Sequence, residues 1–443
     1  MNYRSAKMRR FAATVFAAGI FATAAVAQPG AQPTAPPAGG RGGRGPVVVS
    51  PEVMPDGRVV FRIAAPKAEK VTLSANDVTI LYTGGGAGAL AGTTVSVAPA
   101  AAAPGAPEFV KNEKGIWELS VGPVPPGAYR YVFQVDGVRV LDPVNPRTAE
   151  SRDNAWSLFT VSGDDLMDTC DVPHGAVAEV FYYSSVLKTT RRMHVYTPAG
   201  YESGTQKYPV FYLLHGSGDT DDAWTSVGRA GFILDNLIAG KKAKPMIVVM
   251  PAGHQPGTAG PGAPPPASAA PQTPTVNPFT DEFVTDMMPY VEKHYRTIND
   301  RQHRAIAGLS MGGSQTLDIA FHHLDKFQQI GVFSSGASLG GGGRRGGAAP
   351  GAPAPATPPA AQPARPDWEA THLADLDNAS LKKGTKLVWL STGVDDNLIT
   401  NTRATVELLK KHGFEPVLKE SPGAHSWFNW RNYLIEFTPQ LFQ

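Results

Sequence analysis

The first third of the chain carries short runs in which apolar and polar residues alternate. Apolar side chains occupy every second position in residues 59–63, 117–121 and 129–135, which is the period of a strand buried on one face. The last run leads into Asp136-Gly137, a dipeptide typical of a tight hairpin turn. The pattern predicts a β-sandwich over residues 46–165, which we expect to fold as an independent unit.

From residue 175 onward, continuous apolar strands alternate with helical segments. This alternation predicts an α/β domain over residues 175–443, in which helices cover both faces of a mostly parallel sheet. The ligand-binding and catalytic residues of such sheets lie beyond the carboxyl ends of the strands. The expected strands are residues 193–196, 209–214, 246–250, 304–307, 330–333, 387–391 and 417–419, and the expected helices are residues 230–239, 283–294, 314–324 and 402–412.

Four segments rich in Gly, Pro and Ala interrupt these patterns: residues 28–45, 84–107, 255–278 and 338–366. They have too few large apolar side chains to offset the entropy lost on ordering, so we expect a disordered linker over residues 28–45 and long loops elsewhere. Because the last two segments follow predicted strands, both are expected to leave the carboxyl edge of the sheet.

The first 27 residues have the pattern of an export signal. A basic start precedes an apolar run over residues 11–26 and the small-x-small sequence Ala25-Val26-Ala27. The run is shorter and richer in Ala than a membrane-spanning helix. We therefore predict a signal peptide over residues 1–27, a periplasmic or secreted protein, and no stable membrane anchor.

Charge and cysteine content exclude several classes of partner. The formal net charge is +2, and removal of the four basic residues of the signal peptide gives −2, so no nucleic-acid partner is expected. Cys170 is the single cysteine, which excludes an internal disulfide. No metal or other cofactor is expected, because the chain has no H-E-x-x-H motif and the adjacent His322 and His323 cannot face one ion together.

The sharpest chemical signal is the sequence Gly308-Leu309-Ser310-Met311-Gly312, which lies between a predicted strand and a predicted helix. A nucleophile elbow needs glycines at this spacing because the chain turns tightly to expose the serine hydroxyl above the sheet. The pattern predicts Ser310 as the nucleophile of a serine hydrolase.

A serine nucleophile needs a histidine base and a carboxylate that orients the histidine. In this type of fold the carboxylate follows the serine in the sequence, and the histidine follows the carboxylate. His425 follows the last predicted strand and is the expected base, because His412 lies at a helix end and His372 follows a Gly/Pro/Ala segment. Asp395 and Asp396 follow the strand at residues 387–391. Position alone does not separate these two aspartates.

Two backbone N–H groups must bind the oxyanion that forms during ester cleavage. One belongs to Met311, the residue after the nucleophile, and the other is expected in the loop Leu214-His215-Gly216-Ser217-Gly218. We predict Ser217 as the second donor and a structural hydrogen-bonding role for His215.

Residues 181–443 resemble the esterase D-like family, which includes feruloyl, acetylxylan and enterochelin esterases. The resemblance implies an α/β-hydrolase fold, and it selects Asp396 as the acid because this residue precedes a small-Leu-Ile segment. The motifs that carry it are Arg191 to Pro198, Leu213 to Gly216, Met287 to Glu292, Gly308 to Gly313 and His425 to Trp427.

Residues 46–165 resemble immunoglobulin-like early-set modules that are related to carbohydrate-binding module family 48 and that precede esterase domains. The insertion at residues 84–107 departs from the pattern, so no sugar-binding residue is assigned. The motifs are Ala65-Pro66, Gly115 to Trp117, Gly127 to Tyr131, Val135 to Gly137 and Asp142-Pro143.

These resemblances imply a serine carboxylesterase that acts on ester-linked substituents of plant cell-wall polysaccharide, with ferulate as the expected acyl group, and the predicted signal peptide implies that it is exported. Trp427 and Trp430, close to His425, and Trp224, behind the oxyanion loop, are expected to stack on that aromatic group. The alternatives are an acetylxylan esterase, a siderophore esterase of the enterochelin type, and a glycan-binding protein with an inert hydrolase domain.

Overall fold

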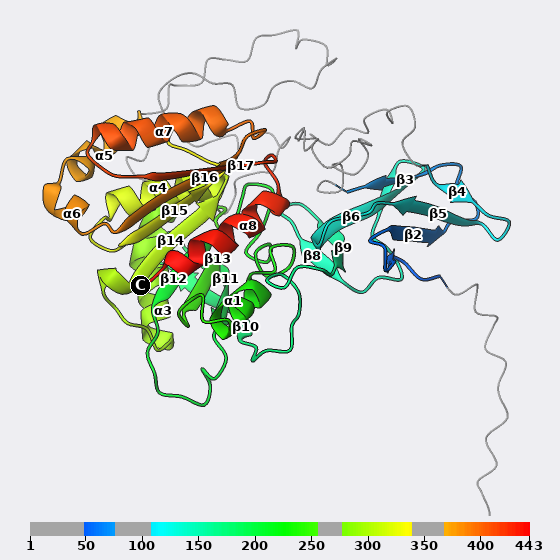
Figure 1. Cartoon of the computed structure of the whole chain (residues 1–443), viewed down its shortest axis with the longest axis horizontal. Helices are drawn as coiled ribbons and strands as arrows, with labels where there is room; N and C mark the ends of the chain where they lie inside the picture. The colour runs from blue at the N-terminus through cyan, green and yellow to red at the C-terminus, as the bar shows by residue number, and fades with distance from the viewer. Residues whose placement is uncertain (1–47, 76–107, 256–276, 339–366) are drawn as a thin grey trace, which may run out of the picture. The chain divides into compact units, whose positions relative to one another are not determined.

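The computed structural model describes residues 48–75, 108–255, 277–338 and 367–443 (Figure 1). The predicted signal peptide and linker lie outside the described residues, as do nearly all residues of the three internal Gly/Pro/Ala segments. Within the described ranges, no helix combines the length and the hydropathy needed to cross a bilayer.

Two antiparallel sheets form the first part of the described chain. Aromatic side chains from both sheets meet in one core, where the ring centroids of Phe61 and Tyr131 lie 4.8 Å apart. Asp136 and Gly137 both have positive φ, at 48° and 83°, as the predicted hairpin turn requires. The first sheet has the order β1 (Glu52–Val53), β2 (Val59–Ala64), β5 (Ile116–Val121), β4 (Val110–Lys111); the second has the order β3 (Val71–Ser74), β6 (Gly127–Val135), β9 (Ala155–Val161), β8 (Thr148–Glu150), with β7 (Val138–Val140) paired to β6.

An eight-stranded sheet forms the centre of the second part. Its strands from β12 onward are parallel, whereas β10 and β11 run antiparallel at one edge. The prediction of a mostly parallel sheet is therefore confirmed. In spatial order the strands are β10 (Ala176–Ser184), β11 (Thr189–Thr197), β13 (Ile247–Pro251), β12 (Val210–Leu214), β14 (Arg304–Leu309), β15 (Gln329–Phe333), β16 (Leu387–Gly393) and β17 (Val417–Ser421).

Helices cover both faces of this sheet because its strands are apolar on both. Along β12, Tyr212 belongs to one apolar cluster, whereas Phe211 and Leu213 belong to the other, as the two-residue period of a strand requires. Figure 1 shows α8 lying against the sheet. One cluster includes α2 (Pro278–Glu282), the π-helical turn η2 (Phe283–Met287), α3 (Met288–His294), α4 (Met311–His322), α5 (Trp368–Leu376) and α7 (Ile399–Lys411); the other includes α1 (Ala230–Ala239) and α8 (Trp427–Phe437). Helix α6 (Ala379–Lys383) is short.

The two parts share apolar and polar contacts, and residues 48–443 form one compact unit. Leu158 of β9 and Met167 belong to the same buried cluster as α1 and α8. Arg130 of β6 donates to the Asp219 carboxylate at 2.5 Å, and both side chains are buried. These contacts differ from the expectation of an independent sandwich, because the sequence pattern of each part does not show which side chains face the other.

Candidate active site

Ser310 lies in a tight turn between β14 and α4. Its backbone has φ 52° and ψ −115°, a conformation that costs free energy for a residue other than glycine and is concentrated at functional sites. The turn is held by the Ser310 amide, which donates to the carbonyl oxygen of Phe333 at 2.9 Å. A side chain at Gly308 would collide with the backbone of Gly312, and a Cβ atom at Gly312 would lie 2.6 Å from the carbonyl oxygen of His215. Both glycines are therefore required by close backbone approach.

Three side chains from separate loops form a hydrogen-bonded chain at the carboxyl edge of the sheet. The Nε2 atom of His425 lies 2.9 Å from Oγ of Ser310. The Nδ1 atom of the same ring lies 3.0 Å from Oδ2 of Asp396. This geometry places a base within reach of the serine proton and a carboxylate behind the base.

The two adjacent aspartates occupy different environments. Asp396 is 2% exposed, and its Oδ1 atom also accepts a hydrogen bond from the Leu398 amide at 2.8 Å. Burial opposes ionisation of the Asp396 carboxyl, but the hydrogen bonds from His425 and Leu398 outweigh burial and lower its pKa. Asp395 is exposed and its side chain is not part of the hydrogen-bonded chain. The carboxylate next to His425 is therefore ionised at neutral pH.

The loops that carry Asp396 and His425 are packed directly against each other. The amide of Asp395 donates to the carbonyl oxygen of Gly423 at 3.0 Å. Gly423 has φ 101°, and a Cβ atom there would lie 2.5 Å from Oδ1 of Asn429. This contact makes glycine the favoured residue at position 423.

Asn429 of α8 supports the His425 loop and was not predicted from the sequence. Its Nδ2 group donates to the carbonyl oxygen of Pro422 at 2.8 Å, and its Oδ1 atom accepts from Ser426 Oγ at 3.1 Å. Asn429 is 1% exposed. In the sequence, Asn429 lies between Phe428 and Trp430. A polar side chain in such an aromatic segment indicates a buried hydrogen-bonding role only once the segment is known to be helix α8.

The predicted oxyanion loop lies beside the nucleophile. A Cβ atom at Gly216 would lie 3.5 Å from Cβ of Ser310. Ser217 follows Gly216 at the exposed end of the loop, and Met311 begins α4 directly after Ser310. The structure therefore brings both predicted donor residues to the neighbourhood of Ser310.

His215 is held in a single neutral form. Its Nδ1 atom lies 2.7 Å from the carbonyl oxygen of Gly216, and its Nε2 atom accepts from the amide of Gly253 at 2.9 Å. Burial lowers the pKa of this ring. His215 joins the oxyanion loop to the chain that follows β13, in keeping with a structural role.

The three tryptophans that were expected to stack on substrate are buried instead. Trp224, Trp427 and Trp430 are 0%, 3% and 6% exposed. Trp224 donates from Nε1 to the carbonyl oxygen of Leu214 and packs edge-on against Trp427, while Trp430 lies edge-on to the His425 ring at 5.0 Å. The predicted stacking role does not agree with this burial. Residues 427–430 begin helix α8, which directs these rings into the core.

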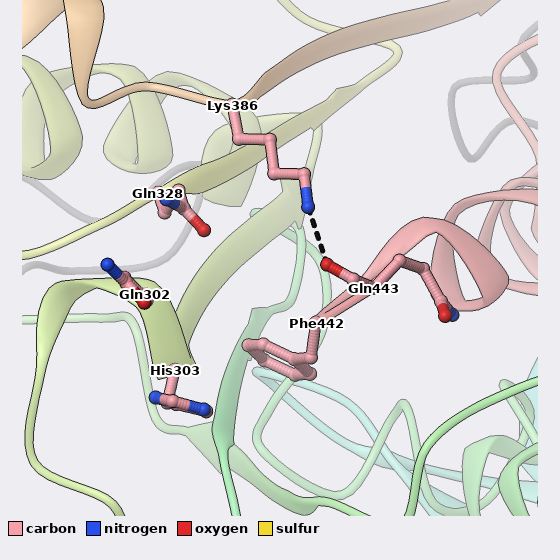
Figure 2. Close-up of a pocket in the computed structure, with 6 residues that line it drawn as sticks. All are labelled: Gln302, His303, Gln328, Lys386, Phe442 and Gln443. Carbon is pink, nitrogen blue, oxygen red and sulfur yellow. Dashed lines mark hydrogen bonds between the residues drawn. The ribbon is translucent and has the colours of Figure 1, made fainter.

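A cavity of about 230 Å³ lies away from the catalytic side chains (Figure 2). Four of its six lining residues, Gln302, His303, Gln328 and Lys386, directly precede β14, β15 and β16, so it lies at the amino edge of the sheet, opposite Ser310; Phe442 and Gln443 follow α8. Figure 2 shows Lys386 pointing to the carbonyl oxygen of Gln443, with which it forms a 2.5 Å hydrogen bond. This cavity brings no catalytic group together.

Comparison with known proteins finds esterases among the proteins that are similar to this chain. A family model described as putative esterase matches residues 184–441. The endo-1,4-beta-xylanase/feruloyl esterase of Xylanibacter ruminicola is 27% identical over 89% of this chain and 46% of the relative. The endo-1,4-beta-xylanase Y of Acetivibrio thermocellus is 24% identical over 67% of this chain and 26% of the relative. The chain thus spans less than half the length of either relative.

A solved structure of the enterobactin esterase from Shigella flexneri matches 87% of this chain and 93% of its own with a TM-score of 0.53 at 15% identity. That likeness supports the α/β-hydrolase fold, as predicted. The predicted relation of residues 46–165 to early-set modules stays a prediction. Because the esterase model covers more than half of the chain and the fold agrees, this chain belongs to the putative esterase family.

Proposed function

We propose that this protein is a serine esterase that cleaves ester-linked substituents, preferably feruloyl groups, from plant cell-wall polysaccharide. The observation that carries the chemistry is the chain of hydrogen bonds from Ser310 through His425 to Asp396. The substrate class rests on the feruloyl esterase and xylanase names of the relatives.

In the first half of the reaction, Oγ of Ser310 attacks the ester carbonyl carbon while Nε2 of His425 takes the hydroxyl proton. The N–H groups of Met311 and Ser217 bind the oxyanion of the tetrahedral intermediate. When the intermediate collapses, His425 returns the proton to the departing sugar oxygen. The acid remains bound as an ester of Ser310.

In the second half, His425 removes a proton from water as the water oxygen attacks the acyl-enzyme carbonyl. Collapse of the second intermediate returns the proton to Ser310 and releases the carboxylic acid. Asp396 acts through His425 in both halves, because its carboxylate fixes the Nδ1–H tautomer and stabilises the imidazolium.

The acyl group is tested by comparing kcat/KM for methyl ferulate, acetylated xylan, a simple acetate ester and an enterochelin-type ester. We expect methyl ferulate to be preferred. Preference for acetate would favour the acetylxylan esterase alternative, and preference for the catecholate ester would favour the siderophore alternative. The Ser310→Ala variant is the control for each substrate and should lose about 10⁴-fold or more in turnover.

The non-enzyme alternative, a glycan-binding protein with an inert hydrolase domain, is tested by the same panel. No Ser310-dependent hydrolysis of any of the four esters, together with binding of xylan by the intact chain, would support it. The proposed esterase function would then be wrong irrespective of the acyl group.

A further inference from the structure

A second cluster of chemically reactive side chains lies on the helices that cover one face of the sheet. Asp318 and His322 are four residues apart on α4, and His372 comes from α5; one ligand atom from each lies within 4.8 Å of the others. The i, i+4 spacing places the first two on the same side of their helix. The rings of His322 and His372 lie 3.9 Å apart. Asp318 is eight residues after Ser310, roughly 12 Å along a helix.

Both histidines keep one ring nitrogen occupied by a backbone carbonyl. The Nδ1 atom of His322 lies 2.8 Å from the carbonyl oxygen of Asp318, and the Nδ1 atom of His372 lies 2.8 Å from that of Trp368. A carbonyl oxygen accepts but does not donate, so each Nδ1 carries the hydrogen. In the neutral ring the Nε2 lone pair is then available, which is the arrangement found in metal-binding histidines.

The carboxylate is oriented in a matching way. Oδ2 of Asp318 accepts a hydrogen bond from Oγ1 of Thr280 at 2.6 Å, which leaves Oδ1 3.4 Å from Nε2 of His372. His372 is 1% exposed, and among the described residues its Nε2 atom has no hydrogen-bond partner. The Asp318 carboxylate and the Nε2 lone pair of His372 are both electron-pair donors, so a cation bound between them would satisfy both groups.

We propose that Asp318, His322 and His372 bind one zinc ion. Zn²⁺ bonds of about 2.0–2.1 Å in a tetrahedral site place neighbouring ligand atoms about 3.3 Å apart, which is close to the 3.4 Å between Asp318 and His372. The other ligand-atom separations in the cluster are at most 4.8 Å, so small side-chain rotations bring all three ligands to zinc-binding distance. Two imidazoles and one carboxylate favour zinc over calcium or magnesium, which prefer oxygen ligands.

The ion joins helices that are separate in sequence. It links α4, which begins directly after the nucleophile, to α5, and through Thr280 it reaches α2. His372 lies 50 residues after His322 in the sequence, so the spacing of the two histidines does not indicate a shared site. Because the cluster is about 12 Å along α4 from Ser310, the ion stabilises the fold and does not touch the reacting atoms.

The experiment uses the full chain after treatment with a chelator. Zinc chloride is titrated into it by calorimetry, and Tm is measured with zinc, with calcium and without metal. We expect one zinc per chain with micromolar or tighter affinity, a rise in Tm of roughly 5 °C at saturating zinc, and no rise with calcium. Cobalt(II) bound in place of zinc should give the visible absorption of a tetrahedral complex.

Variants locate the site. Asp318→Asn and His372→Ala should lose the zinc-dependent rise in Tm, whereas His323→Ala, at the end of the same helix but outside the cluster, should keep it. His322 is only partly buried, so His322→Ala replaces His372→Ala if that variant does not fold, and it should also lose the zinc-dependent rise in Tm. Circular dichroism without metal checks that each variant is folded.

Three outcomes would overturn the proposal. The first is a wild-type chain that binds no zinc at micromolar concentration, in which case no metal ion bridges Asp318 and His372. The second is zinc binding that survives Asp318→Asn and either histidine substitution, which would place the ion elsewhere. The third is an equal rise in Tm with calcium.

Discussion

At the scale of single residues, Asp395 and Asp396 show how strongly burial separates two neighbouring side chains of the same type. The turn after β16 directs Asp396 to His425 and leaves Asp395 exposed. Both residues carry the same charge and follow the same strand, so in the sequence only the resemblance to other esterases distinguishes Asp396. The direction of a side chain in an irregular turn depends on contacts from distant loops, and no local pattern encodes it.

We expect Asp396→Asn to lower kcat by about 10⁴-fold, because an amide neither fixes the correct His425 tautomer nor stabilises the imidazolium. Asp395→Asn is the matched control and should retain kcat within about twofold of wild type. Initial rates of hydrolysis of a chromogenic ester measure kcat for both variants. The opposite ranking would transfer the role to Asp395.

The lowered pKa of Asp396 also predicts how stability depends on pH. A carboxyl whose pKa falls below its ordinary value of 3.8 on folding stabilises the folded state above that pH, and this contribution is lost as pH falls through the folded-state pKa. The free-energy difference between wild type and Asp396→Asn should therefore shrink below about pH 4. Urea unfolding from pH 3 to pH 7 measures it, and a constant difference would contradict the prediction.

At the scale of elements, the position of His425 depends on the packing of a loop against a helix. The loop after β17 is held from one side by Gly423, which lies against the loop after β16, and from the other by Asn429 of α8. A loop that is buried at its base carries backbone groups that must find partners. Asn429 provides one of those partners and thereby positions His425.

Asn429→Ala should lower kcat more than it changes KM, because it leaves the Pro422 carbonyl without its Asn429 donor and loosens the His425 loop. The loss of a buried hydrogen bond of this kind costs about 1 to 3 kcal/mol, and we expect a tenfold or greater loss of kcat. Asn378→Ala removes an exposed helix cap of α6 and is the control for stability. Equal effects of the two variants on kcat would argue against a positioning role.

Most elements of the α/β domain could be predicted because their patterns are local. The helix expected at residues 230–239 is α1 with the same bounds, and the Ser310 elbow lies at the expected junction of β14 and α4. Strand β10 was missed because most of its residues are exposed and lack a clear period. Helix α8 was missed because its first turn, beside His425, was interpreted as an aromatic loop, and that error led to the stacking role of Trp427 and Trp430.

At the scale of the whole molecule, the sandwich contributes to the surroundings of the active site. Arg130 pairs with Asp219, which follows the oxyanion loop, and the amide of Arg152 donates to the carbonyl oxygen of Gly218 at 3.2 Å. A third contact comes from the esterase domain, where Arg431 of α8 donates to the carbonyl oxygen of Ala128 in β6 at 2.9 Å. The esterase domain therefore shares both buried surface and loop support with residues 108–169.

A chain that begins at residue 170 should be poorly soluble or weakly active. Its α1 and α8 cluster would lose Leu158 and Met167 as buried partners, and Asp219 would lose its ion pair with Arg130. The control is a chain that begins at residue 48. Soluble expression and kcat/KM on a small ester measure the outcome, and a fully active fragment would restore the original expectation of independent domains.

The contact between Arg431 and the Ala128 carbonyl has a consequence for the order in which the protein matures. Ala128 is synthesised about three hundred residues before its partner. The hydrogen bond from Arg431 to the Ala128 carbonyl oxygen therefore cannot form until helix α8 has left the ribosome. His425 lies two residues before that helix, so the proposed mechanism requires translation to pass residue 425 before hydrolysis can begin. Under the proposed mechanism, a chain that stops before residue 425 lacks the base and should not hydrolyse esters, which a translation time course with an ester substrate would measure.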